Sequence, residues 1–281
     1  MDIEKLKNHP NFYHGTNNGV LLCGDCLEIM PRLEPVDLVV TSPPYDNLRD
    51  YKGYNFDFKG IAKELFKKTK QGGVVVWVVG DATIHGSETG TSFRHALYFK
   101  ELGFNLHDTM IYEKNGAAYP ASDKSNRYSQ VFEYMFVFSK LKPKTVNLIQ
   151  DKKNNWAGFG SFGQTSGRQV SGGLKKRGRF VVREYSYRNN IWKINNGFGY
   201  GSRDNIAYEH PATFPDALAG DHILTWSDKK NIIMDPMCGS GTVAIMCERY
   251  NRRWIGIEIS LDYCRIAKER IIRETSQLKL F

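Results

Sequence analysis

Apolar residues in the first part of the chain fall into two patterns, short unbroken runs and stretches with helical spacing. Residues 73–80 form the longest run, in which β-branched residues follow a glycine pair and predict a strand buried on both faces. Residues 20–23 and 36–41 are shorter runs that end in turn residues, and we expect strands there as well. Residues 60–70 and 92–102 carry apolar side chains at helical spacing, which predicts two helices.

The remaining pattern continues this alternation of strand and helix. Thr91 or Ser92 is the expected N-cap of the second helix, and Gly103 is its expected C-terminal stop. Two further strands, at 105–112 and 131–139, have the character of an antiparallel pair at a sheet edge. The C-terminal quarter predicts strand, helix, strand and helix at 231–234, 242–250, 253–258 and 261–273. Together these elements predict an α/β fold with a doubly wound, mostly parallel sheet that binds its ligands at the carboxyl ends of the strands.

One region breaks the pattern. From residue 141 to 205 the chain is rich in glycine, and only short strands are expected, near 180–182 and 190–194. Between residues 141 and 204 lie thirteen Lys or Arg against three Asp or Glu, a balance of +10, while the whole chain carries +9. The rest of the chain therefore carries −1. Such concentrated positive charge favours a polyanionic partner, and a solvated surface region is the alternative.

Composition excludes several classes of protein. The 281 residues are 41% hydrophobic, enough for one large α/β domain or for one domain with a sizeable insertion. The longest apolar run is too short to span a bilayer and no secretory signal begins the chain, so we expect a cytoplasmic protein without a membrane partner. The five cysteines have no paired spacing, and Cys23 and Cys26 form a lone CxxC without a second pair or histidines at ligand spacing. We therefore expect free thiols and no metal.

A glycine-rich turn, Asp-Pro-Met-Cys-Gly-Ser-Gly-Thr, spans residues 235–242 between a predicted strand and helix. Its glycines allow a ligand to approach the backbone closely, and the helix N-terminus offers free N–H groups. Glu258 ends the next strand, where a carboxylate can accept hydrogen bonds from both hydroxyls of a ribose. The turn alone is weak evidence, because NAD enzymes use a similar pattern. It is not a phosphate-binding P-loop, since no lysine precedes Thr242.

A second motif, Ser42-Pro43-Pro44-Tyr45, follows the predicted strand at 36–41. Consecutive prolines cannot donate hydrogen bonds and stay extended, so their carbonyls point in fixed directions and can accept from an NH₂ group. Ser42 adds a hydroxyl acceptor, and Tyr45 offers a ring on which a base can stack.

These two motifs together resemble the amino-methyltransferases of DNA, whose catalytic motif is (D/N/S)PP(Y/F). Catalytic motif, basic region and glycine turn follow in the order of the β group of this family, many of them partners of restriction enzymes. The resemblance implies an S-adenosylmethionine-dependent methyltransferase fold with a catalytic half at 1–140, a target recognition region at 141–205 and a cofactor-binding half at 206–281. Residues 209–215 are similar to the family segment that helps enclose the methionine end of the cofactor, and the family pattern makes His210 part of the scaffold.

The resemblance also implies roles for individual residues. Catalysis would fall to Ser42, Pro43, Pro44 and Tyr45, with Tyr45 stacked on a base flipped out of double-stranded DNA. Cofactor binding would fall to Asp25, Asp235, Pro236, Gly239, Ser240, Gly241, Thr242 and Glu258. The basic residues Lys175, Lys176, Arg177 and Arg179 would contact DNA. For Asp25 a turn-capping role is the alternative.

The target base is cytosine N4 or adenine N6. In the family, serine at the first motif position accompanies cytosine more often, so cytosine is favoured. Cys238 sits near the turn, but the Pro-Cys motif of cytosine-C5 enzymes is absent, and packing explains this residue better. Tyr185, Tyr187, Trp192, Phe198 and Tyr200 either stack on bases or build a small core.

Other functions explain less of the sequence. A Rossmann oxidoreductase would leave the Ser-Pro-Pro-Tyr motif and the basic region unexplained. A non-catalytic DNA-binding protein would show damage to one of the two motifs, and an RNA or protein amine methyltransferase more often has asparagine at position 42 and lacks so long a basic insert. A cognate restriction endonuclease and dimerisation are left open.

Overall fold

The chain divides into two compact units in the computed structural model. The structure describes residues 3–44, 56–117, 121–160, 166–176, 181–195, 201–202, 204–209 and 214–278. Unit 1 comprises Met1–Asn147 and Asn190–Phe281, and unit 2 comprises Leu148–Asn189. Unit 2 is therefore an insertion between two parts of unit 1.

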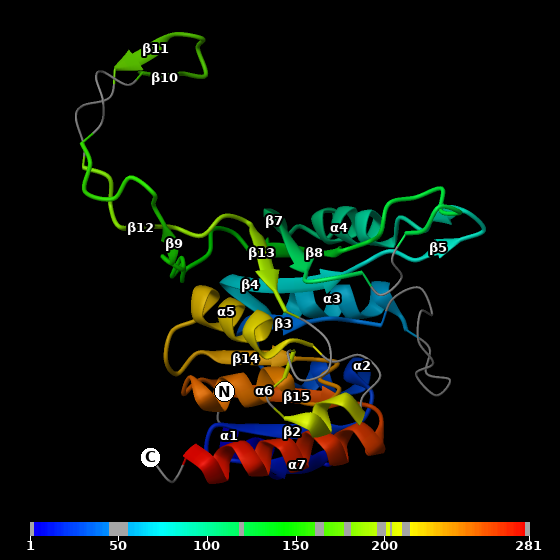
Figure 1. Cartoon of the computed structure of the whole chain (residues 1–281). Coiled ribbons are helices and arrows are strands. Elements are labelled where there is room, and N and C mark those ends of the chain that lie inside the picture. The colour runs from blue at the N-terminus through cyan, green and yellow to red at the C-terminus, as the bar shows by residue number, and fades with distance from the viewer. Residues whose placement is uncertain are drawn as a thin grey trace. The chain divides into compact units, whose positions relative to one another are not determined.

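The described residues of unit 1 form a nine-stranded sheet (Figure 1). Its strands, in spatial order, are β1 (Phe12–Gly15), β2 (Gly19–Cys23), β15 (Arg253–Glu258), β14 (Ile232–Asp235), β3 (Val36–Thr41), β4 (Thr69–Val79), β8 (Phe132–Ser139), β7 (Asn105–Lys114) and β13 (Ile191–Ile194). The five strands from β2 to β4 are parallel, while β8 runs antiparallel to both of its neighbours. The predicted α/β fold with a mostly parallel sheet is confirmed.

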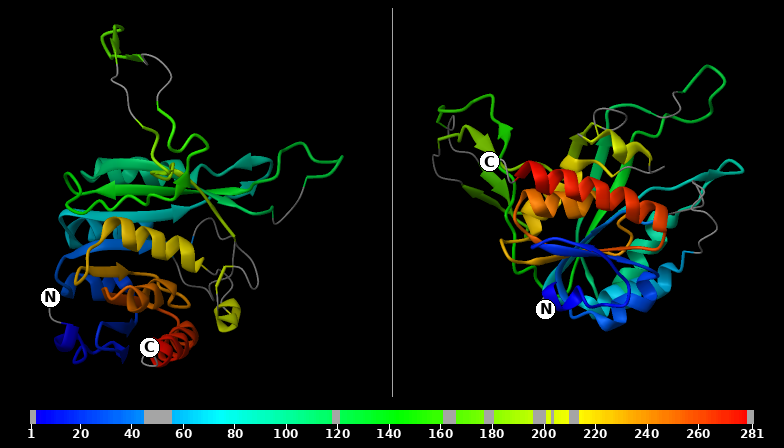
Figure 2. Two further views of the ribbon diagram at one scale, coloured as in Figure 1. Left: turned by 60° about the vertical axis from the view of Figure 1, so that its left-hand side comes forward. Right: turned by 90° about the horizontal axis from the view of Figure 1, so that it is seen from below.

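Helices cover both faces of this sheet (Figure 2). The short helices α1 (Ile3–Leu6) and α2 (Cys26–Ile29) pack with α3 (Phe58–Lys68) and α4 (Thr91–Glu101) on one face, around the buried Trp77 and Phe99. On the other face lie α5 (Asp216–Trp226), α6 (Thr242–Arg249) and α7 (Leu261–Leu278). Within the described ranges, no helix combines the length and apolar composition needed to cross a bilayer.

The strand order predicts a ligand site at the middle of the sheet. After β14 the chain passes through α6 to β15 on one side, whereas the neighbouring β3 leads through α3 to β4 on the other side. Connections that leave adjacent parallel strands in opposite directions open a crevice at their carboxyl ends. The residues that follow β14 and β3 therefore line the expected binding position.

Three local features differ from the sequence prediction. The N-cap of α4 is Gly90, in a left-handed conformation, and not Thr91 or Ser92. Ser92 instead donates its backbone N–H to Oδ1 of Asp81 (2.9 Å), a tertiary contact that takes precedence over capping. Strands β7 and β8 are the expected antiparallel pair, but β13 lies outside them and forms the sheet edge. Helix α7 continues to Leu278, five residues beyond the expected end.

Unit 2 is held together mainly by backbone pairing. Its described strands form two short antiparallel pairs, β9 (Lys152–Lys153) with β12 (Tyr185–Ser186), and β10 (Ser166–Arg168) with β11 (Leu174–Lys176). Large apolar side chains are exposed, among them Trp156 at 64% and Leu174 at 69%. The described residues of this unit therefore form little hydrophobic core, in keeping with the glycine-rich sequence.

The aromatic residues near the end of the insertion separate into two groups. Tyr185 and Tyr187 are exposed in unit 2, so they do not build a core there. Trp192, expected in the same region, is buried in β13 of unit 1, where its ring packs against His222 at a centroid distance of 4.6 Å. Phe198 and Tyr200 lie outside the described residues.

Candidate active site

The two sequence motifs begin side by side at the carboxyl edge of the sheet. Strands β3 and β14 are adjacent and parallel, and the Thr41 hydroxyl at the end of β3 donates to Oδ1 of Asp235 at the end of β14 (2.8 Å). Ser42 and Pro43 follow Thr41 directly, so they start next to the glycine-rich turn. Pro43 is buried and Ser42 is half-buried, whereas Tyr45 lies outside the described residues.

The turn after β14 requires its glycines. Gly239 and Gly241 have φ angles of 49° and 81°, in the left-handed region that favours glycine. A Cβ added to Gly241 would lie 3.0 Å from Cβ of Ala267 on α7, so a side chain there meets both backbone strain and a neighbouring helix. The turn ends at the N-terminus of α6, whose first N–H groups have no acceptor within the helix. This is a suitable position for a ligand with acceptor oxygens.

Glu258 supports this turn from the neighbouring strand β15. Its Oε2 accepts the N–H of Gly239 (2.8 Å) and its Oε1 accepts the N–H of Ser260 (2.9 Å). Burial raises the pKa of this carboxyl, and the two backbone N–H groups oppose the shift. Each oxygen of a carboxylate has a second lone pair, so Glu258 can still accept from two hydroxyls. The arrangement therefore fits the expected contact with a ribose.

Asp235 is almost fully buried between the two motifs, with 6% of its surface exposed. Besides Thr41, the N–H of Met237 donates to its Oδ1 (3.2 Å). Burial is the main reason that the pKa of Asp235 rises to about 7, and the nearby carboxylate of Glu258 adds to the shift. The buried edge of the sheet thus holds two carboxyl groups, which favours a cationic ligand.

The raised pKa of Asp235 predicts a pH dependence that asparagine removes. Because its folded pKa of about 7 exceeds the ordinary value, its contribution to stability is complete below about pH 4 and is lost as the pH rises through 7. For Asp235→Asn, which keeps an acceptor for Thr41 and Met237, we expect the stability advantage of the wild type to fall over this range, by at most about 4 kcal/mol.

Urea unfolding from about pH 5 to pH 8 measures this difference. Asp262→Asn, at an exposed position on α7, is the matched control and should show no such trend. A constant difference between wild type and Asp235→Asn would contradict the expected titration.

Asp25 lies two residues past the end of β2. The last residue of β2, Cys23, pairs with Glu258, the last residue of the neighbouring strand β15. Its Oδ1 accepts the N–H of Leu27 (2.8 Å) and caps the short helix α2. The capping alternative is therefore present in the structure. One hydrogen bond leaves a carboxylate with further acceptor capacity, so a contact between Asp25 and the cofactor stays a prediction.

Ser240 and Thr242 are buried, and their hydroxyl oxygens accept hydrogen bonds from the guanidinium of Arg270 on α7. Sequence reasoning missed Arg270. The available signal was its spacing, because Arg270 falls on the buried stripe of α7 together with Ala267 and Ile271. A charged residue on an apolar helix face usually has polar partners within the fold.

The sequence also led to expectations for one cysteine, Cys238, and one histidine, His210. Burial raises the pKa of the Cys238 thiol, the sulfur of which packs against Gly256, so packing accounts for this residue. His210 lies outside the described residues. Across the part of the chain that the structure describes, no group of three or more His, Cys, Asp or Glu could hold a metal ion.

Comparison with known proteins identifies related sequences and structures. A family model described as DNA methylase, for the N6/N4 methyltransferases, matches residues 36–269. The orphan methyltransferase M.BamHII of Bacillus amyloliquefaciens is 54% identical over 249 residues, which cover 88% of this chain and 90% of that protein. The family model thus spans both strand-end motifs of this chain.

Two solved structures share the fold. The cytosine-N4-specific PvuII DNA methyltransferase superposes with a TM-score of 0.66 at 22% identity, covering 94% of this chain and 93% of that chain. The complex of M1.HpyAVI with S-adenosylmethionine superposes with a TM-score of 0.59 at 20% identity, covering 89% of this chain and 98% of that chain.

Proposed function

Since this chain belongs to the DNA methylase family of N6/N4 methyltransferases, we propose that it methylates the exocyclic N4 amine of cytosine in double-stranded DNA. The chain is an S-adenosylmethionine-dependent enzyme, as the two motifs predicted. The observation that carries the proposal is the hydrogen bond between Thr41 and Asp235, because it joins the catalytic motif to the cofactor turn.

In this proposal the residues of the Ser-Pro-Pro segment orient the amine. Ser42 Oγ and the carbonyl of Pro43 accept its two hydrogens, which directs the nitrogen lone pair towards the methyl donor. Pro43 and Pro44 keep the backbone extended, so these acceptors are fixed before the base arrives. The bound cofactor supplies an electrophilic methyl group, and the protein contributes mainly position and electrostatics.

Four residues at the ends of β14 and β15 hold the cofactor in this proposal. Glu258 accepts from the ribose hydroxyls, and the backbone of the turn at Gly239 and Gly241 allows close approach of the cofactor. The buried carboxyl of Asp235 favours the positive sulfonium near it. The target base has to leave the duplex to reach Ser42, at a cost of a few kcal/mol that protein contacts offset.

Two observations favour cytosine over adenine. Serine occupies position 42, where the family pattern accompanies cytosine more often. The PvuII enzyme, which shares the fold over 94% of this chain, is named as cytosine-N4-specific. Adenine N6 is the alternative, because the same two acceptors can hold either amine.

Nucleoside analysis tests the proposal. Unmethylated DNA of mixed sequence is incubated with enzyme and S-adenosylmethionine, digested to nucleosides and examined by mass spectrometry. We expect N4-methyldeoxycytidine, and heat-inactivated enzyme is the control. Detection of N6-methyldeoxyadenosine would show that adenine, not cytosine, is the target base. If the DNA stays unmodified, the proposed methylation is contradicted.

We further propose that the basic region at 141–205, which includes unit 2, is the target recognition region. Lys175 is exposed on β11, and Lys176 follows it in the same strand. Arg177 and Arg179 lie outside the described residues. The argument for a DNA contact is the same for all four residues. Each carries a positive charge, and phosphate contacts supply much of the affinity of DNA-binding proteins.

Replacing Lys175, Lys176 and Arg177 by glutamine should weaken DNA binding. Each lost phosphate contact should also flatten the dependence of log K on log salt by about 1. Binding isotherms at several salt concentrations measure both effects. The matched control replaces the exposed Lys63, Lys67 and Lys100 on the helices of unit 1, which changes the net charge equally. Equal affinity and slope in both variants would show that these residues do not contact DNA.

The remaining expectations about partners and location are unaffected by these observations. A cognate restriction endonuclease, dimerisation and a cytoplasmic location stay predictions. Among them, sedimentation of the purified protein would decide the oligomeric state.

A further inference from the structure

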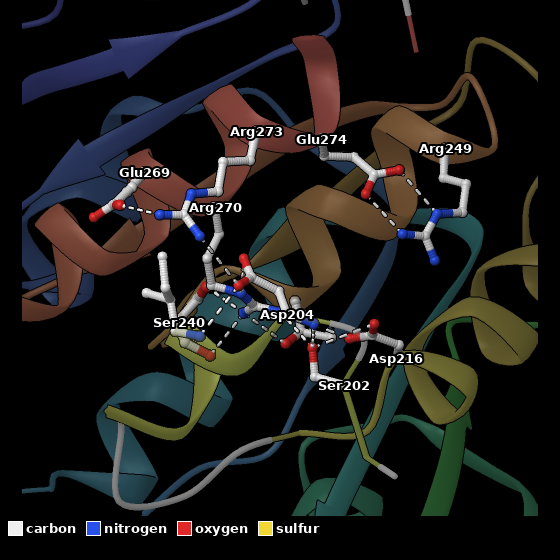
Figure 3. Close-up of polar contacts among 11 residues, drawn as sticks. Ser202, Asp204, Asp216, Ser240, Arg249, Glu269, Arg270, Arg273 and Glu274 are labelled. Atoms are coloured by element: carbon white, nitrogen blue, oxygen red, sulfur yellow. Dashed lines mark hydrogen bonds and ion pairs between the residues drawn. The ribbon is translucent and has the colours of Figure 1, made fainter. Parts of the chain in front are cut away.

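Arg270 is a charged side chain inside the protein. It lies in the middle of α7 with 1% of its side chain exposed. Burial of a guanidinium without partners is strongly unfavourable, so its contacts have to compensate for lost hydration. These contacts reach two segments that are far from α7 in sequence (Figure 3).

The first segment is the glycine-rich turn. Nη1 of Arg270 donates to the carbonyl oxygen of Ser240 (2.6 Å), to Oγ of Ser240 (3.0 Å) and to Oγ1 of Thr242 (3.2 Å). Ser240 stands between Gly239 and Gly241, the two positions with left-handed backbone. The contact therefore holds the turn between its two left-handed glycines from the side of α7.

The second segment leads from Ser202 to the start of α5. Nη2 of Arg270 donates to Oγ of Ser202 (3.1 Å) and lies 3.7 Å from Oδ1 of Asp216, while Nε lies 3.6 Å from Oδ2 of Asp204. Oγ of Ser202 also accepts the N–H of Asp204 (3.3 Å). One guanidinium thus contacts residues on both sides of 209–215, the stretch similar to the family segment around the methionine end of the cofactor.

We propose that Arg270 is a positioning residue for cofactor binding, which holds the glycine-rich turn in the arrangement that the cofactor requires by tying it to Ser202, Asp204 and Asp216. This inference rests on the proposed cofactor site. A guanidinium suits the role because its planar fork presents donors in several fixed directions, whereas a lysine offers one point charge. Arg270 acts through the backbone it holds and does not itself contact the reacting atoms.

The neighbouring arginines have a different environment. Arg273 is 53% exposed, pairs with Glu269 (2.7 Å) and also lies 3.7 Å from Asp204, whereas Arg265 is 65% exposed beside Asp262. Exposed ion pairs contribute little because water and salt screen them. Arg265 does not belong to the network around Ser240 and Ser202, so it provides a matched control on the same helix.

The test compares Arg270→Lys, Arg270→Met and Ser202→Ala with Arg265→Met. Affinity for S-adenosylhomocysteine is measured by calorimetry at a temperature at which circular dichroism shows each variant folded, and KM for the donor and kcat are measured with DNA. Loss of charge-assisted hydrogen bonds predicts a Kd and KM about tenfold higher or more for Arg270→Met, with kcat at saturating donor little changed. Arg270→Lys and Ser202→Ala should show smaller increases, and Arg265→Met none.

Since Arg270 and Ser202 share one contact, the effect on Kd of the double variant Arg270→Lys/Ser202→Ala should be smaller than the product of the single effects. If Arg270→Met does not fold, Arg270→Lys and Ser202→Ala decide the matter. Folded variants with the Kd and KM of the wild type, and only a lower melting temperature, would overturn the proposal. Because Kd is measured without DNA, a wild type that binds S-adenosylhomocysteine but does not methylate cytosine would contradict the proposed target and leave this comparison intact.

Discussion

Replacing Tyr45 by alanine is expected to slow methyl transfer about 100-fold, while the affinity for the cofactor changes less than about twofold. Tyr45 ends the Ser-Pro-Pro-Tyr motif, so its ring is the proposed surface on which the flipped base stacks. Stacking of a base on an aromatic ring contributes about 1–3 kcal/mol, which corresponds to roughly 5- to 150-fold. Misorientation of the amine at Ser42 places the expected effect in the upper part of this range. Single-turnover methylation at saturating cofactor measures it.

Tyr45→Phe is the control, because it retains the ring and removes only the hydroxyl. We expect its rate to stay close to that of the wild type. Cofactor affinity should survive in both variants, since the glycine-rich turn and Glu258 belong to β14 and β15, whereas Tyr45 follows β3. An alanine variant that methylates DNA at the wild-type rate would exclude the stacking role.

Replacing Glu258 by glutamine is expected to raise the Kd for S-adenosylhomocysteine about 100-fold, although the side chains have nearly the same shape. Both carboxylate oxygens accept a backbone N–H, from Gly239 at 2.8 Å and from Ser260 at 2.9 Å. A glutamine places an NH₂ group opposite one of them, so one backbone donor loses its acceptor. The cofactor then meets a turn whose backbone is no longer held in place, and its ribose hydroxyls donate to a neutral amide in place of a carboxylate. Together these changes weaken binding by about 3 kcal/mol.

Stability should change less than binding in Glu258→Gln. Burial raises the pKa of Glu258, which means that keeping the carboxylate charged costs folding free energy, and the neutral amide avoids this cost. Calorimetric Kd values and thermal unfolding separate the two effects. Wild-type affinity in this variant would contradict the assignment of Glu258 to the cofactor site.

A second buried glutamate provides the matched control. Glu248 on α6 accepts hydrogen bonds from Asn18 (2.7 Å) and Trp254 (2.7 Å), and Asn18 precedes β2 at the amino edge of the sheet. Glu248→Gln should therefore lower stability and leave the Kd for the cofactor unchanged. A rise in Kd equal to that of Glu258→Gln would mean that general loosening of the fold explains both.

The sheet and the position of the site could be predicted because their signals are local. The apolar run within β4 is buried along its whole length, as an unbroken β-branched run indicates. Thr41 and Asp235 are 194 residues apart, yet each ends a parallel strand, and carboxyl ends of parallel strands meet at one edge. No sequence pattern shows that Thr41 and Asp235 are close together, but the rule for parallel strands predicts it.

Features that depend on distant partners could not be predicted. The N-cap of α4 is Gly90 and not Thr91 or Ser92, and the N–H of Ser92 donates to Asp81, eleven residues earlier in the chain. Trp192 was expected in the inserted region, but β13 pairs with β7 and carries it into the core of unit 1. Arg270 finds its partners in two segments remote from α7, so its sequence context showed only a charge on an apolar face.

A crystal structure of the enzyme with S-adenosylhomocysteine and a duplex containing its target would show where the amine and the cofactor bind. We predict that the ligand sulfur lies beside Ser42 and the carbonyl of Pro43, with the ribose on Glu258 and the extruded cytosine amine within about 3–3.5 Å of the methyl position. A ligand bound away from the edge at which β3 and β14 end, or an amine that contacts neither Ser42 nor Pro43, would contradict it.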